Sequence, residues 1–351
     1  MSLFQKLFKQ TFIYGLATVL PRMLSFILVP LYTKVMAPGC YGEVTLIYAW
    51  FAIFNVVLAY GMETAFFRFY NTSEHRKNVT STALISIGAS TGIFVLFALL
   101  FKDSLASILN IEFRYIEYVI YILALDALVI VPFAWLRANE QPMRYALVKI
   151  LNVAINLGLN VFFLLLLPGL AEDNPKTLLE AIYIPDFEIS YIFISNLAAS
   201  GITLLIMFRR YLLVSYAFDR SLWRKMMKYA LPVMVAGVAF TINEVFDRVL
   251  LSELLPEGIA KAEIGKYSAC YKLALFMTLF ATAFRLGIEP FFFSHASSEE
   301  PEKAYAQITN YFVVLGSVIL LVVVVFADLL KQLFILDPDY WEAMPIVPII
   351  L

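Results

Sequence analysis

Charged side chains inside long apolar stretches are the residues of this sequence that could do chemistry. A charge in hydrocarbon is costly, so such residues usually face a cavity or a partner and mark substrate or ion pathways. Both signs of charge occur here, which allows anion binding, ion coupling or ion pairing. The cations are Arg22, Arg248, Lys272 and Arg285, and the anions are Glu63, Asp126, Glu244, Asp247 and Glu289.

Three of the cations are candidates for contacting an anionic substrate. Arg22 follows a proline, which can bend a helix, and a guanidinium at a bend could hold a phosphate through two hydrogen bonds. The alternative for Arg22 is an ion pair with Asp126. Lys272 is a second substrate-binding candidate. Arg285 can pair with Glu289, four residues later on one helix face, or can contact substrate at an inner gate.

Four acids are candidates for ion coupling or gating. Asp126 is the most deeply placed of them and could cycle a proton, or pair with Arg22. Asp247 could bind a coupling proton or sodium ion, or belong to a hydrogen-bonded outer rim. Glu63 and Glu289 could gate the pathway, or extend to the membrane interface. We expect no cofactor other than such a coupling ion.

Three asparagines are spaced by four residues and so form one helical stripe. A polar stripe in a membrane often bonds neighbouring helices. If the stripe faces a cavity instead, it suits sugar hydroxyls, which makes Asn152 and Asn156 substrate-binding candidates. The stripe consists of Asn152, Asn156 and Asn160.

The elements that must position these residues are membrane helices. The chain of 351 residues is 62% hydrophobic and 15% charged, with a mean hydropathy of +0.81, whereas an ordinary globular domain carries about 25% charge. Its apolar stretches approach the roughly 20 residues that span a bilayer. The sequence predicts an all-α polytopic membrane protein with helices near 12–36, 41–67, 79–101, 115–136, 145–168, 188–208, 229–251, 266–293 and 307–327, and the start of another at 345–351.

The distribution of Lys and Arg between alternate loops predicts the orientation. With the N-terminus on the cytoplasmic side, the inner segments carry more Lys and Arg than the outer ones, as the positive-inside rule requires. The most basic inner segment is 209–228, and the outer segment 169–187 is acidic. The basic segment is either a simple topogenic loop or an interfacial segment at the lipid headgroups.

An internal repeat predicts two lobes. Residues 61–67 (Gly-Met-Glu-Thr-Ala-Phe-Phe) resemble 287–293 (Gly-Ile-Glu-Pro-Phe-Phe-Phe), and Tyr41-Gly42 resembles Gly265-Lys266 at a similar offset. Parallel repeats of this kind occur in transporters; the alternative is chance similarity between Phe-rich segments. The prediction is a first lobe of six helices at 1–208, a basic cytoplasmic connection at 209–228, and a pseudo-symmetric second lobe at 229–351 that is incomplete.

Enzyme and nucleic-acid functions receive no support from the sequence. The net charge is -1, and there are only two histidines and two cysteines, which argues against a basic nucleic-acid binder and leaves little for a metal site or a catalytic triad. Walker, GxGxxG, HExxH and CxxC motifs are missing. We therefore expect a non-enzymatic protein that does not use ATP bound to this chain.

The sequence resembles the polysaccharide and O-antigen repeat-unit flippases. These belong to the multidrug/oligosaccharidyl-lipid/polysaccharide exporter superfamily. The resemblance covers essentially the whole chain, and its motifs are diffuse. It lies in residues 12–16 (Phe-Ile-Tyr-Gly-Leu), Pro21-Arg22, residues 30–32 (Pro-Leu-Tyr), Tyr41-Gly42, and the segment from Asn243 to Arg248.

This resemblance implies two six-helix lobes around a central cavity. It implies alternating-access transport of undecaprenyl-pyrophosphate-linked oligosaccharide across the bacterial cytoplasmic membrane, for lipopolysaccharide or another surface polysaccharide. Arg22 then corresponds to a cation facing the anionic headgroup, and Asp247 with Arg248 to an acidic-basic pair. The implied partners are lipid-linked oligosaccharide, membrane lipids, a glycan polymerase and glycosyltransferases.

Three alternatives differ in testable ways. An ion-coupled multidrug antiporter of the same fold would expose acids such as Asp126 and Asp247 in an aromatic pocket. A membrane glycan polymerase or ligase usually needs large outer loops, which this chain lacks. An assembly scaffold would leave the intramembrane charges unexplained.

We predict that Arg22→Ala abolishes substrate translocation without preventing membrane insertion, because it removes the cation expected to hold the headgroup. The measurement is surface polysaccharide in a strain that lacks its own flippase. Full complementation by this variant would refute the role of Arg22.

Overall fold

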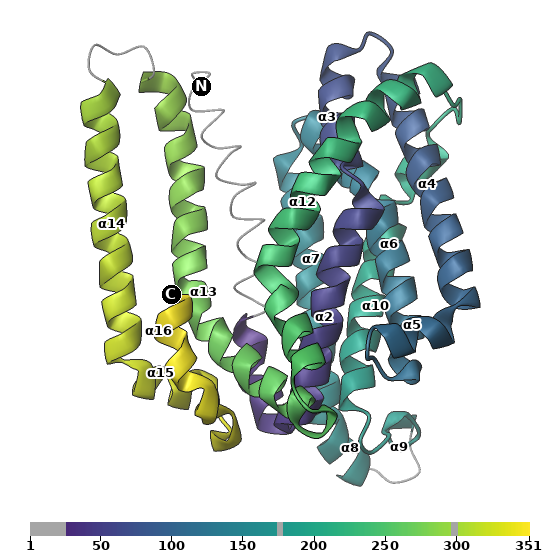
Figure 1. The fold of residues 1–351 in the computed structure, drawn as a ribbon. Coiled ribbons are helices and arrows are strands. Elements are labelled where there is room, and N and C mark those ends of the chain that lie inside the picture. Colours follow the sequence, from purple (N-terminus) through teal and green to yellow (C-terminus); the bar gives the residue numbers. More distant parts are fainter. Residues whose placement is uncertain (1–25, 174–177, 296–300) are drawn as a thin grey trace. The chain divides into compact units, whose positions relative to one another are not determined.

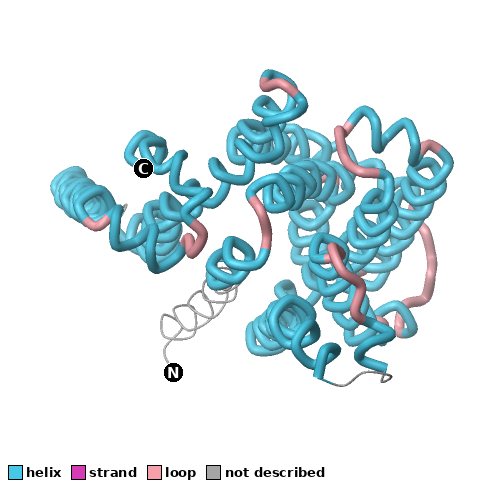
Figure 2. Tube along the Cα trace, turned by 90° about the horizontal axis from the view of Figure 1, so that it is seen from below, coloured by secondary structure: helices cyan, strands magenta, loops and turns pink. Residues whose placement is uncertain are grey.

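The protein is helical throughout the part of the chain that the structure describes (Figures 1 and 2). This computed structural model describes residues 26–173, 178–295 and 301–351; for residues 178, 283, 285–295 and 301–304 it describes the helix path alone. No strand occurs among these residues. The first described helix covers Phe26–Val35.

The described residues contain seven helical segments that are long and apolar enough to cross a membrane. This finding confirms the predicted fold class, a polytopic all-α membrane protein. The helix predicted at 266–293 is present within the longer α13 (Glu257–His295), which is not one of the seven segments. The seven segments are Pro38–Thr72, Arg76–Leu100, Phe113–Ala138, Pro142–Asp173, Glu188–Leu212, Arg220–Leu254 and Tyr305–Val325.

The chain divides into two compact units, one formed by 43–260 and the other by 1–42 with 261–351. We call them unit 2 and unit 1. The lobe boundary predicted at 209–228 stays a prediction. Unit 2 contains most of α2 (Pro38–Ala59), then α3 (Met62–Thr72), α4 (Arg76–Leu100), α5 (Lys102–Ile108), α6 (Phe113–Ala138), α7 (Pro142–Val161), the π-helix η1 (Phe162–Leu166), α8 (Leu167–Asp173), α9 (Leu178–Ile182), α10 (Glu188–Met207), α11 (Arg209–Leu212) and α12 (Arg220–Leu254).

Helix α6 is the centre of unit 2. It packs against α3, α4, α7 and α10, and α10 also packs against α7. Its sequence is apolar on all sides, and many of its residues are buried, including Pro132. A helix that is hydrophobic all round is suited to burial among other helices. Most side chains in the middle of α6 are therefore buried or half-buried within unit 2.

The helix predicted at 41–67 is broken into α2 and α3. The break lies at Tyr60 and Gly61, which have φ angles of 33° and 70°. Gly61 adopts this left-handed conformation without the steric cost of a Cβ atom. Its backbone also lies against α12, because a Cβ added to Gly61 would lie 2.2 Å from the carbonyl oxygen of Ala230.

The predicted basic connection at 209–228 is largely helical. Arg209–Leu212 form α11, and α12 begins at Arg220, nine residues before the predicted helix start. The physical reason is a helix cap: a side-chain oxygen of Asp219 accepts a hydrogen bond from the backbone N–H of Leu222 at 3.0 Å. Such a cap satisfies a backbone donor that the first helical turn leaves free.

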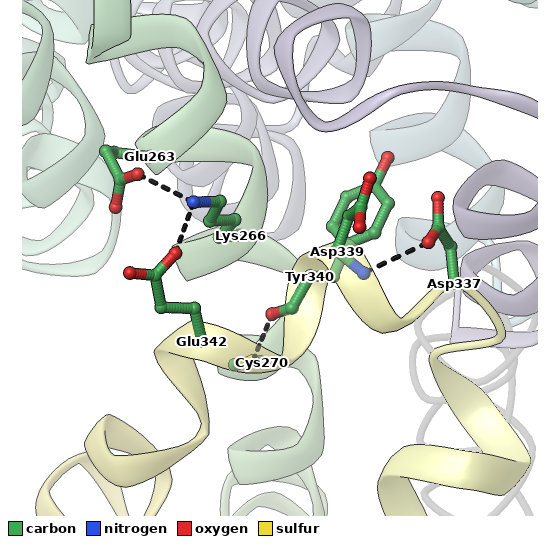
Figure 3. Close-up of polar contacts among 7 residues, drawn as sticks. All are labelled: Glu263, Lys266, Cys270, Asp337, Asp339, Tyr340 and Glu342. Atoms are coloured by element: carbon green, nitrogen blue, oxygen red, sulfur yellow. Dashed lines mark hydrogen bonds and ion pairs between the residues drawn. The ribbon is translucent and has the colours of Figure 1, made fainter.

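Unit 1 contains the described first helix, α13, α14 (Pro301–Val325), α15 (Ala327–Phe334), the 3₁₀-helix η2 (Pro338–Ile346) and α16 (Val347–Ile350), which lies in the segment predicted to start another helix. Tyr340 of η2 is fully buried. Its hydroxyl donates to the carbonyl oxygen of Met36 at 2.7 Å, and its own carbonyl oxygen accepts from the thiol of Cys270 at 3.4 Å. Nearby, Lys266 of α13 contacts both Glu263 and Glu342 (Figure 3).

Two glycines bring the first turns of α2 and α13 together within unit 1. A Cβ added to Gly42 would lie 1.7 Å from the carbonyl oxygen of Lys261, and one added to Gly265 would lie 1.9 Å from that of Pro38. The two contacts are reciprocal, because each glycine approaches the carbonyl oxygen of the residue four positions before the other glycine. The internal repeat suggested by the similarity between Tyr41-Gly42 and Gly265-Lys266 stays a prediction.

We predict that Gly61→Ala destabilises the protein by about 2 kcal/mol or more, because the new methyl group must adopt a left-handed conformation and push α12 away. The thermal unfolding midpoint of the purified protein measures this effect. Gly88→Ala is the matched control, since no atom lies within 4 Å of a Cβ at that half-buried helical position. Equal midpoints for the two variants would contradict the prediction.

Candidate functional site

A cluster of polar side chains surrounds Asp126 inside unit 2. Asp126 lies at the middle of α6, and its neighbours come from α2, α7 and α10. Polar groups at this depth have no water or headgroups to bind, so they must satisfy one another. We call this group the Asp126 cluster; its members are Tyr48, Asp126, Lys149, Asn152, Asn196, Ser200 and Thr203.

The contacts of Asp126 and its neighbours join three helices. The hydroxyl of Ser200 on α10 donates a 2.7 Å hydrogen bond to Oδ1 of Asp126. One turn earlier on α10, the amide of Asn196 donates to the hydroxyl oxygen of Tyr48 on α2 at 3.3 Å. Tyr48 also lies within electrostatic range of Asp126. The carboxyl therefore has a hydrogen-bond donor and retains acceptor capacity for a proton or a cation.

The predicted asparagine stripe contributes one member to the cluster. The amide of Asn152 on α7 donates to Oγ1 of Thr203 on α10 at 2.9 Å, and Thr203 in turn donates to the carbonyl oxygen of Ala199 at 2.8 Å. Asn160 instead donates to Asn156 Oδ1 at 2.9 Å, within α7. These contacts are of the helix-bonding kind that was the alternative to sugar binding for this stripe.

Lys149 is the cation of the cluster. It lies on α7 one turn before Asn152, and its ammonium is 4.4 Å from the centroid of the Phe133 ring on α6. Both Asp126 and Glu63 lie within its electrostatic range, but no ion pair joins Lys149 to Asp126. A cation that lies near a carboxylate without contacting it leaves the carboxylate oxygens accessible to a second cation.

Other predicted residues of unit 2 form ion pairs. Glu63 of α3 pairs with Arg137 of α6 at 2.6 Å, and both side chains are 44% exposed. Asp247 pairs with Arg248 at 2.9 Å on α12, where the Arg248 side chain is only 9% exposed. Arg248 also donates to the carbonyl oxygen of Glu244 at 3.1 Å. The role that the resemblance implied for Asp247 and Arg248 stays a prediction.

The remaining predicted residues are not brought into the Asp126 cluster by described contacts. Lys272 is half-buried on α13 in unit 1. Arg285 and Glu289 lie four residues apart on the same helix, and their side chains are outside the described part. Arg22 lies outside the described residues. The predicted alternative of a pair between Arg22 and Asp126 stays a prediction.

Sequence reasoning missed most of the Asp126 cluster. Asn196, Ser200 and Thr203 are spaced by four and three residues, so they form a polar stripe on one face of an otherwise apolar helix. Lys149 precedes Asn152 by three residues and therefore shares its face. These spacings were the available signal, whereas Tyr48 had none, because tyrosine is common in membrane helices.

Comparison with solved structures shows which fold these helices form. An inward-facing multidrug resistance MATE family transporter of the MOP superfamily matches with a TM-score of 0.67 and 15% identity, over 96% of this chain and 76% of that chain. An outward-facing transporter of that family matches with a TM-score of 0.58 and 14% identity, over 97% and 78%. Vibrio cholerae MATE transporter VcmN in the bent form matches with a TM-score of 0.57 and 16% identity, over 98% of this chain and 77% of that chain. The fold is thus that of a multi-pass transporter.

Comparison of the sequence with protein families gives a match to a family with a different name from that of these transporters. The polysaccharide biosynthesis protein family matches residues 7–292, and no protein in the comparison with curated sequences matches this chain. The chain therefore belongs to the polysaccharide biosynthesis protein family. Its fold is one that these multidrug resistance transporters share.

We predict that Thr203→Val costs about 0.6–2 kcal/mol of stability, because it leaves the Asn152 amide without its acceptor between two membrane helices. Thr309→Val is the control, since Thr309 is exposed and donates only to Tyr305 of its own helix. Unfolding of both variants in the same detergent measures the difference. A cost for Thr309→Val equal to that for Thr203→Val would contradict the prediction.

Proposed function

We propose that the protein is a flippase that moves undecaprenyl-pyrophosphate-linked oligosaccharide across the bacterial cytoplasmic membrane for surface polysaccharide synthesis, including lipopolysaccharide. The observation that carries this proposal is the match of a polysaccharide biosynthesis family over most of a chain with a multi-pass transporter fold. Translocation by alternating access suits such a fold. Its partners are lipid-linked oligosaccharide, membrane lipids, a glycan polymerase and glycosyltransferases, and its N-terminus is cytoplasmic.

The Asp126 cluster is proposed as the site that couples an ion to transport. It combines a mid-membrane carboxyl, a nearby cation and hydroxyl donors within the interior of unit 2. A carboxyl in this setting can exchange a proton or a sodium ion when the surrounding helices move, which links the ion gradient to the conformational change. Arg22, Lys272, Arg285, Asn152 and Asn156 stay candidates for substrate contacts.

Asp247, Glu63 and Glu289 stay candidates for coupling or gating. The ion pairs of Glu63 with Arg137 and of Asp247 with Arg248 are suited to gating, because an ion pair can break and re-form between two conformations. The pair of Glu63 lies at the membrane end that is predicted to face the cytoplasm.

A second candidate function is ion-coupled export of drugs or toxins. It is favoured by the likeness to multidrug resistance transporters in fold and by Asp126, a half-buried carboxyl in the middle of a spanning helix. Surface polysaccharide and drug tolerance separate the two functions when the complete gene is expressed in strains that lack either activity. Restored polysaccharide without altered drug tolerance supports the flippase, and the reverse result refutes it.

We predict that Asp126→Asn lowers transport on the order of tenfold or more while leaving the amount of folded protein unchanged, because the amide still accepts from Ser200 but cannot take up a proton. Restored surface polysaccharide per amount of membrane protein is the measurement. Ser200→Ala is the companion variant, since it removes the donor and keeps the carboxyl. Full activity of Asp126→Asn would refute the coupling role.

A further inference from the structure

A cavity with a volume of about 480 Å³ lies within unit 2, where α3 and α6 end and α4 begins. This end carries the connections between membrane-spanning segments, and those connections are predicted to face the cytoplasm. Its wall includes Arg76 and Lys77 of the first turn of α4 and Arg210 of α11. The cavity is therefore at the level of the lipid headgroups.

The charge of this cavity is entirely positive. No aspartate or glutamate lines it, and an adjoining cavity that shares Arg210 adds Arg144 and Arg209. Within the described part of the chain, no ion pair involves any of these five cations. Arg210 lies in electrostatic range of both Arg144 and Arg209. Like charges gathered in this way repel one another, so a bound anion would lower their electrostatic free energy.

Two of these cations lie against aromatic rings. The Arg210 guanidinium lies 3.2 Å from the centroid of the Trp135 ring, and that of Arg76 lies 5.3 Å from the Tyr70 ring. The Tyr70 hydroxyl donates to Oδ1 of Asn139 at 3.1 Å, and Asn139 donates to the carbonyl oxygen of Trp135 at 2.9 Å. A guanidinium fixed by stacking loses less freedom when it binds a phosphate.

The chain after α11 is also fixed against α4. The hydroxyl of Ser81 donates to the carbonyl oxygen of Ala217 at 2.7 Å, and Thr82 accepts from the backbone N–H of Asp219 at 3.1 Å. The segment that carries Arg210 is therefore tied at both ends, since α10 precedes it. The cavity is consequently part of the folded unit.

Two further properties select the kind of anion. The first turn of the 25-residue helix α4 forms part of the wall, and the positive end of a helix dipole favours phosphate. Deeper in the cavity, Leu84, Val131 and Pro132 make the wall apolar. A ligand with a phosphate at one end and hydrocarbon at the other fits both parts.

We propose that this cavity binds the phosphate-bearing headgroup of an anionic membrane lipid. A free phosphate ion has the same oxygen atoms for the cations to bind, but it has no hydrocarbon to contact the apolar wall. We therefore propose the lipid as the ligand. Basic pockets between membrane helices recognise such headgroups in this way. The proposal does not depend on which substrate the protein transports.

The test is the retention of phosphatidylglycerol, compared with phosphatidylcholine, by the purified full-length protein in native mass spectrometry. We expect the protein to retain phosphatidylglycerol and Arg76→Gln/Lys77→Gln to lower its apparent affinity roughly tenfold or more. Arg224→Gln/Lys225→Gln is the matched control, because it removes two exposed charges of the neighbouring helix α12 that do not line the cavity. If the first variant does not fold, Arg210→Gln gives the same test.

Each outcome has a defined meaning. A loss confined to the cavity variants, with no displacement of the lipid by inorganic phosphate, supports the proposal. Equal losses in the control variant would mean that general surface charge attracts the lipid, and no loss in any variant would mean that the cavity does not bind it. Displacement by inorganic phosphate, with both lipids retained equally, would identify a soluble phosphate as the ligand. Any of these last three results overturns the proposal.

Discussion

Hydrocarbon offers no hydrogen-bond partner to a polar group, and this constraint governs the arrangement of the whole molecule. Backbone amides inside a spanning helix are satisfied by that helix, and a polar side chain at membrane depth is costly unless it finds a partner. The contacts of Ser200 with Asp126 and of Asn152 with Thr203 meet this need between α6, α7 and α10. They also fix which faces of these helices meet, because rotation of a helix would leave its polar groups in an apolar environment without hydrogen-bond partners.

Close backbone approach is the second organising feature. Gly61 allows α12 to lie against the start of α3, and Gly42 and Gly265 allow two helix starts to cross. Association of helices in lipid depends on packing and hydrogen bonds rather than on burial of apolar surface from water. Small residues at the crossings therefore take the place that large apolar side chains hold in a soluble protein. The same glycines lie in the segments whose similarity predicts an internal repeat.

The two kinds of polar site in unit 2 differ in their depth and in their chemistry. The Asp126 cluster lies at the middle of the membrane-spanning segments and contains one acid and one cation that do not form an ion pair. The basic cavity lies at the end of those segments and contains cations alone. The first arrangement is suited to exchanging a small ion, and the second to holding a phosphate at a surface where water and lipid headgroups are present.

Much of the helical architecture followed from hydropathy, because a membrane helix needs a long apolar run that is visible residue by residue. Boundaries were less predictable: the cap at Asp219 starts α12 early, and Gly61 divides α2 from α3, since both effects depend on local backbone geometry rather than on hydropathy. Among the candidate site residues, Asp126, Glu63 and Asp247 were found because a charge stands out in an apolar run. Lys149 was missed because it lies near the start of its helix and resembled a loop cation. Ser200 was missed because it carries no charge.

The sequence by itself determined that the chain is a multi-pass helical membrane protein, that charges occur within its spans, and that its family is one of polysaccharide biosynthesis. These properties reside in single segments, so composition and spacing reveal them. Only the tertiary structure decided which polar groups meet: Asp126 with Ser200, Glu63 with Arg137, and Arg210 with Trp135. The physical reason is that these contacts join residues of separate helices, whose rotation and neighbours depend on packing throughout the unit.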